Sequence, residues 1–188
     1  DGIAIGQTAY NVKGYSYNDY LKDYYEENSI LKEYITEFTN EKETTETLLL
    51  KLQNNYTLES TNTSITQAIA KAKILTIALG MDELHFETEL SSDKIAKYVK
   101  NMDKILKMLR IYNKRSIYLI SLYPTKKISK ETIQKINEQL KAICEKYSII
   151  FIDITNISEQ KNYFFTPNSY YFNYKAHQYI SEKIIENV

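Results

Sequence analysis

Three short apolar runs constrain the fold of this chain more than any other feature. They are ILTIALG at 74–80, SIYLISLYP at 116–124 and IIFIDI at 149–154. Each run is apolar at consecutive rather than alternating positions, which is typical of strands buried on both faces of a parallel sheet. Helical patterns separate the runs, and parallel strands need such crossover connections. The runs therefore predict an α/β fold.

Amphipathic helices are predicted between and around these strands. The segment 91–113 repeats apolar residues at spacings of three and four, and 129–147 begins with a serine that can cap a helix. Further helices are predicted at 15–28, 44–55, 63–72 and 174–188, and a further strand at 30–38, where β-branched and aromatic residues partly alternate. This order predicts a three-layer α/β/α sandwich with a mostly parallel sheet, in one domain spanning 1–188.

Charge and hydropathy exclude several classes of partner. The chain has 24 Lys and Arg residues against 24 Asp and Glu residues, so it presents no overall positive field for nucleic acid. No apolar run approaches the roughly 18 residues of a membrane-spanning helix. The single cysteine, Cys144, lies on the apolar face of the helix predicted at 129–147, where we expect a buried and inert thiol.

Tyrosine is abundant, with 18 residues, and five of them cluster near the start of the chain. They are Tyr15, Tyr17, Tyr20, Tyr24 and Tyr25. Their spacing places several on one face of the helix predicted at 15–28. The stripe packs against the core, or it forms an exposed aromatic surface for a protein partner. Burial of these rings would favour the first interpretation, and exposure the second.

The segments that follow the predicted strands carry a family resemblance. Sites in open parallel sheets form at the carboxyl ends of the strands. The segments are DGIAIGQ at 1–7, FTNEKETTETLLLKL at 38–52, LTIALGMDELHF at 75–86, ISLYPTKK at 120–127 and TPNSYYFNYKAHQYISEKI at 166–184. In this order they resemble the sequence blocks of the SGNH or GDSL family of esterases and lipases. The resemblance implies the family's fold and, as ancestral substrates, acylated lipid, glycan or cell-envelope material.

The residues that give that family its chemistry are replaced one by one. The resemblance places Gly2 at the nucleophilic serine, Lys42 at the oxyanion-hole glycine, Asp82 at the oxyanion-hole asparagine, Asn168 at the triad aspartate and Tyr171 at the catalytic histidine. Glycine has no side chain with which to attack, and a tyrosine with a pKa near 10 is a poor base at neutral pH. Restoring serine alone is therefore not expected to restore activity.

The remnant site is expected to keep a pocket. The resemblance makes Asp1, Gly80, Glu83 and His85 candidates for its lining. A charge-assisted hydrogen bond between Lys42 and Asp82 would fill the former oxyanion hole. In the alternative interpretation, both side chains point to solvent.

Other arrangements of chemically active residues are weaker. Asp1, Asp82, Glu83 and His85 are metal-ligand types, but they form no metal motif, so we predict no metal and no cofactor. Ser64, Ser121 and Ser169 have no His and Asp partners at a recognisable spacing. His177, in the helix predicted at 174–188, is a candidate for a relocated base.

These observations predict a pseudoenzyme of the SGNH type with a binding or structural role at the bacterial cell envelope. The alternative is an active esterase that uses relocated residues such as His177. In the family a central strand runs directly into the block that DGIAIGQ resembles. We therefore expect such a strand upstream of Asp1, with an export signal or membrane anchor.

Overall fold

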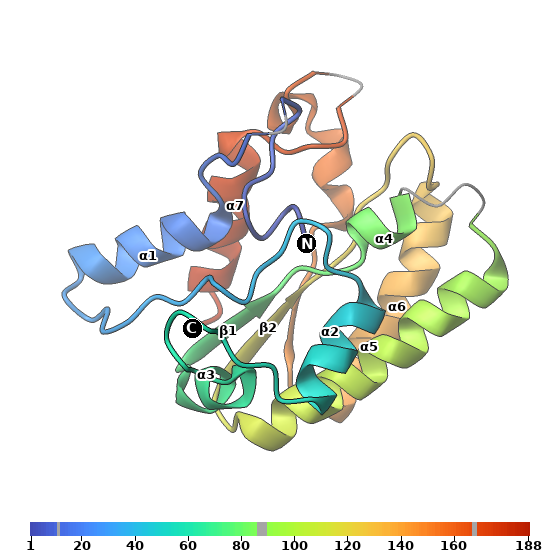
Figure 1. Cartoon of the computed structure of the whole chain (residues 1–188). Coiled ribbons are helices and arrows are strands. Elements are labelled where there is room, and N and C mark those ends of the chain that lie inside the picture. The colour runs from blue at the N-terminus through green and yellow to red at the C-terminus, as the bar shows by residue number, and fades with distance from the viewer. Residues whose placement is uncertain (11, 86–89, 167–168) are drawn as a thin grey trace.

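The three apolar runs form a parallel sheet. The structure, a computed structural model, describes residues 1–10, 12–85, 90–166 and 169–188. The strands are β1 (Ile74–Ile77), β2 (Ser116–Ile120) and β3 (Ile150–Ile152), in the order β1-β2-β3. Leu75 lies opposite Ile117, and Leu119 opposite Phe151. The three predicted buried strands are therefore confirmed (Figure 1).

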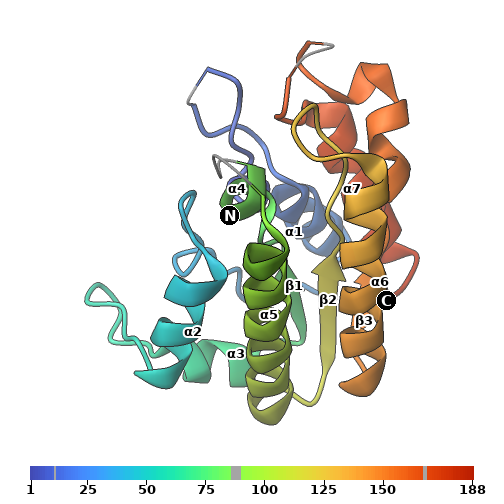
Figure 2. The ribbon, with the colours of Figure 1, turned by 90° about the vertical axis from the view of Figure 1, so that its right-hand side faces the viewer.

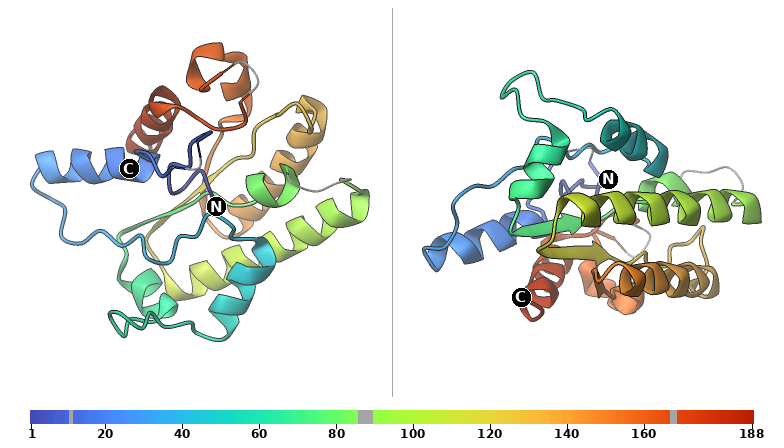
Figure 3. Two further views of the ribbon diagram at one scale, coloured as in Figure 1. Left: turned by 45° about the horizontal axis from the view of Figure 1, so that its top comes forward. Right: turned by 90° about the horizontal axis from the view of Figure 1, so that it is seen from below.

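Helices cover both faces of the sheet. On one face lie α1 (Tyr17–Glu27) and α7 (Tyr174–Ile185), and on the other α2 (Thr45–Gln53), α5 (Ser92–Tyr112) and α6 (Lys130–Lys146) (Figures 1 and 2). Shorter elements are α3 (Ile65–Lys71), α4 (Met81–His85), η1 (Thr155–Glu159) and η2 (Lys161–Tyr163). The same layers appear from above and from below (Figure 3). The predicted three-layer α/β/α sandwich is confirmed.

Side-chain caps fix where the helices begin. Ser16 caps α1 by accepting a hydrogen bond from the backbone nitrogen of Asp19, and the Asp19 carboxylate accepts one from the Ser16 backbone nitrogen. Ser129 caps α6 by accepting a hydrogen bond from the backbone nitrogen of Thr132. Each cap satisfies an amide that has no partner inside the helix, which is why the predicted serine positions mark the helix starts.

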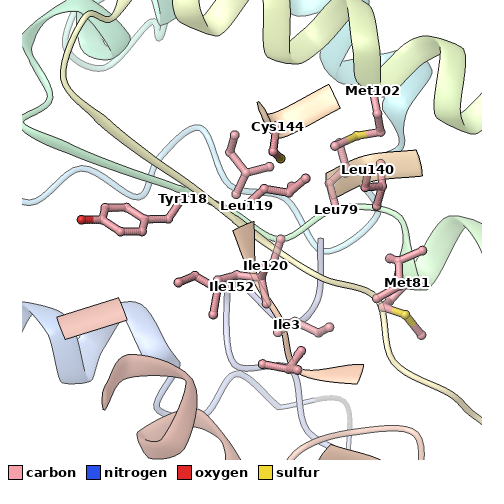
Figure 4. Close-up of a cluster of buried hydrophobic side chains, with 14 of the residues drawn as sticks. Ile3, Leu79, Met81, Met102, Tyr118, Leu119, Ile120, Leu140, Cys144 and Ile152 are labelled. Atoms are coloured by element: carbon pink, nitrogen blue, oxygen red, sulfur yellow. The ribbon is translucent and has the colours of Figure 1, made fainter. Parts of the chain in front are cut away.

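The core lies where the sheet meets the helices of both layers (Figure 4). Its labelled members are Ile3, Leu79, Met81, Met102, Tyr118, Leu119, Ile120, Leu140, Cys144 and Ile152. The residues of β2 from Ile117 to Ile120 are almost completely buried, as expected of a central strand covered on both faces. Cys144 is also buried, as predicted, and burial raises the pKa of its thiol to about 12.

The strand predicted at 30–38 is wrong. These residues, all of them described, form no strand and run as an irregular segment over the surface. Ile30 and Ile35 are exposed, while the Tyr34 hydroxyl donates to the Asp19 carboxylate at 3.0 Å. A β-branched and aromatic run favours a strand only where a neighbouring strand pairs with it. Here the Tyr34 side chain contacts α1 instead.

The tyrosines of α1 divide between core and surface. Tyr17 is fully buried, Tyr20 and Tyr25 are half-buried, and Tyr15 and Tyr24 are exposed. The expected core stripe is therefore confirmed for Tyr17 but not for Tyr15 or Tyr24. Among the described residues, no helix combines the length and the apolar character needed to cross a bilayer.

Candidate functional site

The opening segment lies over the carboxyl ends of the strands. The backbone nitrogen of Asp1 donates to the Ala78 carbonyl at 2.9 Å, immediately after β1. The Asp1 carboxylate accepts from the backbone nitrogens of Ile3 at 3.3 Å and Met81 at 3.1 Å. Asp1 is buried, and its side chain is used to join the opening turn to the start of α4. This places Gly2 beside the first turn of α4.

Asp82 is the centre of the site. Its Oδ2 accepts a hydrogen bond from the Gly2 backbone nitrogen at 2.6 Å, and its Oδ1 accepts one from the Tyr170 hydroxyl at 2.5 Å. Hydrogen bonds to a carboxylate are among the stronger ones in proteins. One side chain thereby connects the opening turn, α4 and the loop before α7.

The space beside Gly2 is filled by this carboxylate. A Cβ at position 2 would lie 3.0 Å from Asp82 Oδ2 and 3.2 Å from Gln7 Cβ. These separations are tighter than ordinary van der Waals contacts, so a larger residue would displace one of its neighbours. Glycine at position 2 and the bound Asp82 side chain therefore fit each other.

Aromatic rings close the rest of the site. The small cavity beside Gly2 is lined by Tyr123, Tyr170, Tyr171, Phe172 and His177, together with Gly2, Ile3, Gln7 and Asp82. Its volume of about 10 Å³ is room for one water molecule. Burial raises the pKa of the Tyr170 phenol, and the Tyr123 and Asp82 charges add to this effect. Tyr170 is therefore a neutral hydrogen-bond donor at physiological pH.

His177 faces this cavity from α7. Its ring is almost completely buried and lies beside Tyr17 and Phe172, at centroid distances of 6.5 and 6.0 Å. Within the described part of the chain, its Nδ1 has no hydrogen-bond partner. Burial lowers the pKa of His177 to about 4, so the imidazole is neutral at pH 7.

The predicted pair of Lys42 and Asp82 is wrong. Lys42 is exposed, and the ion pairs found among the described residues include none between Lys42 and Asp82. Asp82 is held instead by Gly2 and Tyr170. The neighbour of Lys42, Glu43, is the buried residue of that loop and pairs with Lys51.

The other predicted lining residues have structural partners. Glu83 accepts from the Thr45 backbone nitrogen at 2.7 Å and from its hydroxyl at 2.9 Å, which joins α4 to α2. Gly80 has φ +114° and packs against the Tyr98 ring. His85 Nδ1 lies 3.1 Å from the Thr125 hydroxyl, and its ring stacks on Tyr170 at 4.1 Å. Within the described residues, Asp1, Asp82, Glu83 and His85 form no metal-binding group.

The loop before α7 holds the residue that sequence reasoning missed. Tyr171 lines the cavity, but Tyr170 donates to Asp82. Asn168 lies outside the described residues. Alignment through a loop fixes a position only to within a residue, and two adjacent tyrosines offer no pattern that distinguishes them. Tyr123 was missed too, although it directly precedes Pro124 at the end of a buried run, where sites in parallel sheets form.

Comparison with solved structures identifies the fold. A structure described as TesA matches at TM-score 0.71 and 11% identity, covering 99% of this chain and 93% of that one. A putative GDSL-like lipase from Parabacteroides merdae matches at 0.70 and 12%, covering 99% and 91%. A lipase/acylhydrolase from Enterococcus faecalis matches at 0.68 and 14%, covering 100% and 91%. No family model and no curated protein sequence matches the chain. The fold is that of SGNH/GDSL-like hydrolases.

Proposed function

From this hydrolase fold, we propose that the chain is a catalytically degenerate SGNH-type protein. Its role would be binding or structural, at the bacterial cell envelope and outside the cytoplasm. One observation carries the proposal: the Asp82 carboxylate occupies the space beside Gly2 and accepts hydrogen bonds from Gly2 and Tyr170. The groups that a catalytic site would offer to a substrate are bound to each other.

The lining of the cavity supports the loss of nucleophilic catalysis. Among its described residues there is no serine, threonine or cysteine. The hydroxyls present are phenols, and Tyr170 and Tyr123 are held protonated by burial. Covalent catalysis of acyl transfer needs a nucleophile with a base in hydrogen-bond reach. His177 would supply a neutral base, but among the described residues that line the cavity no aliphatic hydroxyl or thiol accompanies it.

Electrostatics at the cavity oppose hydrolysis as well. Acyl transfer develops negative charge on the substrate oxygen, and catalytic sites place hydrogen-bond donors there. Here the Gly2 amide donates to Asp82, and the carboxylate charge itself would repel the developing oxyanion. A cavity with room for one water also leaves no space for an ester group.

An active hydrolase is the second candidate, because of His177. Its imidazole is neutral at pH 7, and within the described residues its Nδ1 has no hydrogen-bond partner and is available to a water molecule. The lowered pKa of about 4 makes it a weaker general base than an ordinary histidine. Acyl esters are the substrate class that the names of the structural neighbours suggest. This candidate requires Tyr170 and Asp82 to separate and admit the ester.

Turnover of p-nitrophenyl acetate by the purified chain distinguishes the two candidates. We expect a rate no greater than that of a His177→Gln variant, and the same result for Gly2→Ser, since a serine Cβ would meet the Asp82 carboxylate. Gln139→Ala, an exposed change on α6, serves as the matched control. Turnover that His177→Gln abolishes and Gln139→Ala keeps would overturn the pseudoenzyme proposal.

The binding role has two proposed partners. Acyl or glycan material of the envelope is the ligand class that the family resemblance suggests. A protein partner on α1 is supported by Tyr15 and Tyr24, which are exposed and belong to the edge-to-face ring pairs Tyr15–Tyr20 and Tyr24–Tyr25. Replacing Tyr15 and Tyr24 with serine would weaken that partner's binding and leave the fold intact.

A further inference from the structure

A second hollow lies at the carboxyl end of β3, away from Gly2. It is lined by Asp153, Ile154, Asn156, Ile157, Glu159, Gln160, Tyr163 and Tyr179, and we refer to it as the β3 groove. Its volume is about 200 Å³, against about 10 Å³ for the cavity at Gly2. Its lining residues come from the end of β3 and the turns η1 and η2, and from α7 through Tyr179; these segments are orange and red in Figure 1.

The β3 groove presents polar side-chain atoms that form no hydrogen bond with the described part of the protein. Asp153 Oδ1 accepts from the Thr155 backbone nitrogen at 2.8 Å and its hydroxyl at 2.5 Å, which fixes the carboxylate at the start of η1. Within the described residues, Asp153 Oδ2 and the side-chain amides of Asn156 and Gln160 have no hydrogen-bond partner. One positioned carboxylate oxygen and two free amides therefore face a ligand-sized space.

Two tyrosines give the groove an aromatic wall. The rings of Tyr163 and Tyr179 lie 5.5 Å apart with an angle of 34° between their planes, and both are half-buried. Lys183 Nζ lies 5.6 Å from the centre of the Tyr179 ring. The buried side chains of Ile154 and Ile157 form the floor beneath the polar rim. The wall is thus apolar, and the rim donates and accepts hydrogen bonds.

We propose that the β3 groove binds an uncharged sugar ring of a carbohydrate. Sugar hydroxyls both donate and accept hydrogen bonds, as do the amides of Asn156 and Gln160, and Asp153 Oδ2 accepts from a hydroxyl. The C–H faces of a sugar ring are apolar and suit the tyrosine wall. The volume is below the roughly 300–1,000 Å³ of pockets for drug-sized ligands, so the groove holds one ring or the end of a chain.

The acidic side chains of the groove restrict which sugars can bind. Asp153 and Glu159 are both acidic, and Lys130 pairs with Glu159 at 2.5 Å at the outer edge. Acidic sugars or phosphorylated sugars would bring a second negative charge beside Asp153, which disfavours them. The groove therefore selects neutral rings over uronic acids.

This inference deepens the proposed binding role, for which glycan is one of the ligand classes, and it places sugar binding at a site distinct from the cavity at Gly2. It concerns residues that the cavity at Gly2 does not share and needs no ester hydrolysis. A failure of sugar binding leaves the pseudoenzyme proposal unchanged, and detection of ester turnover leaves the β3 groove unchanged. The binding measurement below therefore tests this inference alone.

The test is saturation-transfer NMR on the full chain, with chitotriose as the uncharged probe and glucuronate as the acidic one. We expect saturation transfer from the protein to chitotriose. The expected dissociation constant is on the order of 10 mM, which corresponds to weak binding at a single site. The Asn156→Ala/Gln160→Ala variant should bind about tenfold more weakly, because two ligand hydrogen bonds are lost. Gln139→Ala, which removes an exposed amide on α6 that does not line the groove, should bind as the unchanged chain does.

The outcomes are distinguishable, because the side chains of Asn156 and Gln160 are exposed and, within the described residues, make no hydrogen bond that truncation to alanine would remove. No transfer to chitotriose would overturn the proposal. So would equal binding by the double variant and Gln139→Ala, or glucuronate binding as tight as that of chitotriose. A loss confined to the double variant, in a protein with unchanged melting temperature, would support it.

Discussion

The cavity at Gly2 and the β3 groove lie at the same edge of one sheet and differ in how they use polar groups. At Gly2, the carboxylate, the backbone amide and the phenol bond to one another, and the rings leave room for one water. At the β3 groove, two amides and a carboxylate oxygen face an open space of about 200 Å³. Polar groups that satisfy each other contribute to stability, and those left unpaired at a surface are available to a ligand. We therefore expect substitutions at Gly2 to change stability, and substitutions at the β3 groove to change binding.

The largest loss of stability is expected for Gly80→Ala, at the residue just before α4, the helix that carries Asp82. Gly80 has φ +114°, which side chains rarely adopt, and a Cβ there would lie 2.3 Å from Tyr98 Cε2. Tyr98 is buried and donates to the Leu79 carbonyl at 3.0 Å, so it cannot move without losing that bond. We expect a loss of about 4 kcal/mol, measured by urea unfolding. A loss below about 1 kcal/mol would show that the contact between Gly80 and Tyr98 adapts to the added methyl group.

The next effect concerns Asp82 itself. Asp82→Ala removes the acceptor of both the Gly2 amide and the Tyr170 hydroxyl, and we expect it to lower the free energy of unfolding by about 3 kcal/mol. Asp82→Asn keeps one acceptor oxygen and should cost less. The matched change in the β3 groove is Glu159→Ala, which removes only a surface ion pair and should cost about 0.5 kcal/mol. Equal losses for Asp82→Ala and Glu159→Ala would remove the distinction between the two regions.

The sequence predicts the β-α framework better than it predicts the site. Consecutive apolar residues identify β1, β2 and β3. A strand buried on both faces is apolar at every position, so its own residues are enough to predict it. The segment at 30–38 fails for the opposite reason: its alternation describes a strand only if another strand pairs with it, and its isoleucines are exposed.

Site residues depend on contacts that no local pattern contains. Asp82 is identified by its place after the first apolar run, but its partners are 80 and 88 residues away along the chain. The sequence therefore predicts the loss of a nucleophile at Gly2, and it does not distinguish Tyr170 from Tyr171 or Glu43 from Lys42. The β3 groove has no sequence signal, since its tyrosines come from η2 and α7.

Lowering the pH should reduce the free energy of unfolding through His177, which lines the cavity at Gly2. Burial lowers its pKa to about 4, whereas the unfolded chain has the ordinary histidine value near 6.5. Between these values the unfolded state binds the extra proton, so stability is full above about pH 7 and falls as the pH drops towards 4. We expect a loss of about 2 kcal/mol from pH 7 to pH 5, at most about 1.4 kcal/mol per pH unit.

The His177→Gln variant isolates this contribution. Other groups titrate in the same range, including His85, whose pKa is also lowered, mainly by burial. The measured quantity is therefore the difference between the stability-versus-pH curves of the two proteins. If that difference is flat between pH 7 and pH 5, His177 is solvated or already paired in solution, and the cavity is more open than the structure describes.

The smallest effect on stability is expected in the β3 groove, from Asn156→Ala/Gln160→Ala. Both side chains are exposed and, within the described residues, form no hydrogen bond, so the free energy of unfolding should change by less than about 0.5 kcal/mol. Thermal unfolding of the double variant beside Gln139→Ala measures this. A loss above about 1 kcal/mol would mean that these amides stabilise η1 and η2. Substitutions in the groove and at Asp82 would then both lower the free energy of unfolding and differ only in size. An unchanged melting temperature would show that neither amide is needed for stability. Both would then be available to a ligand, as the proposed sugar binding requires.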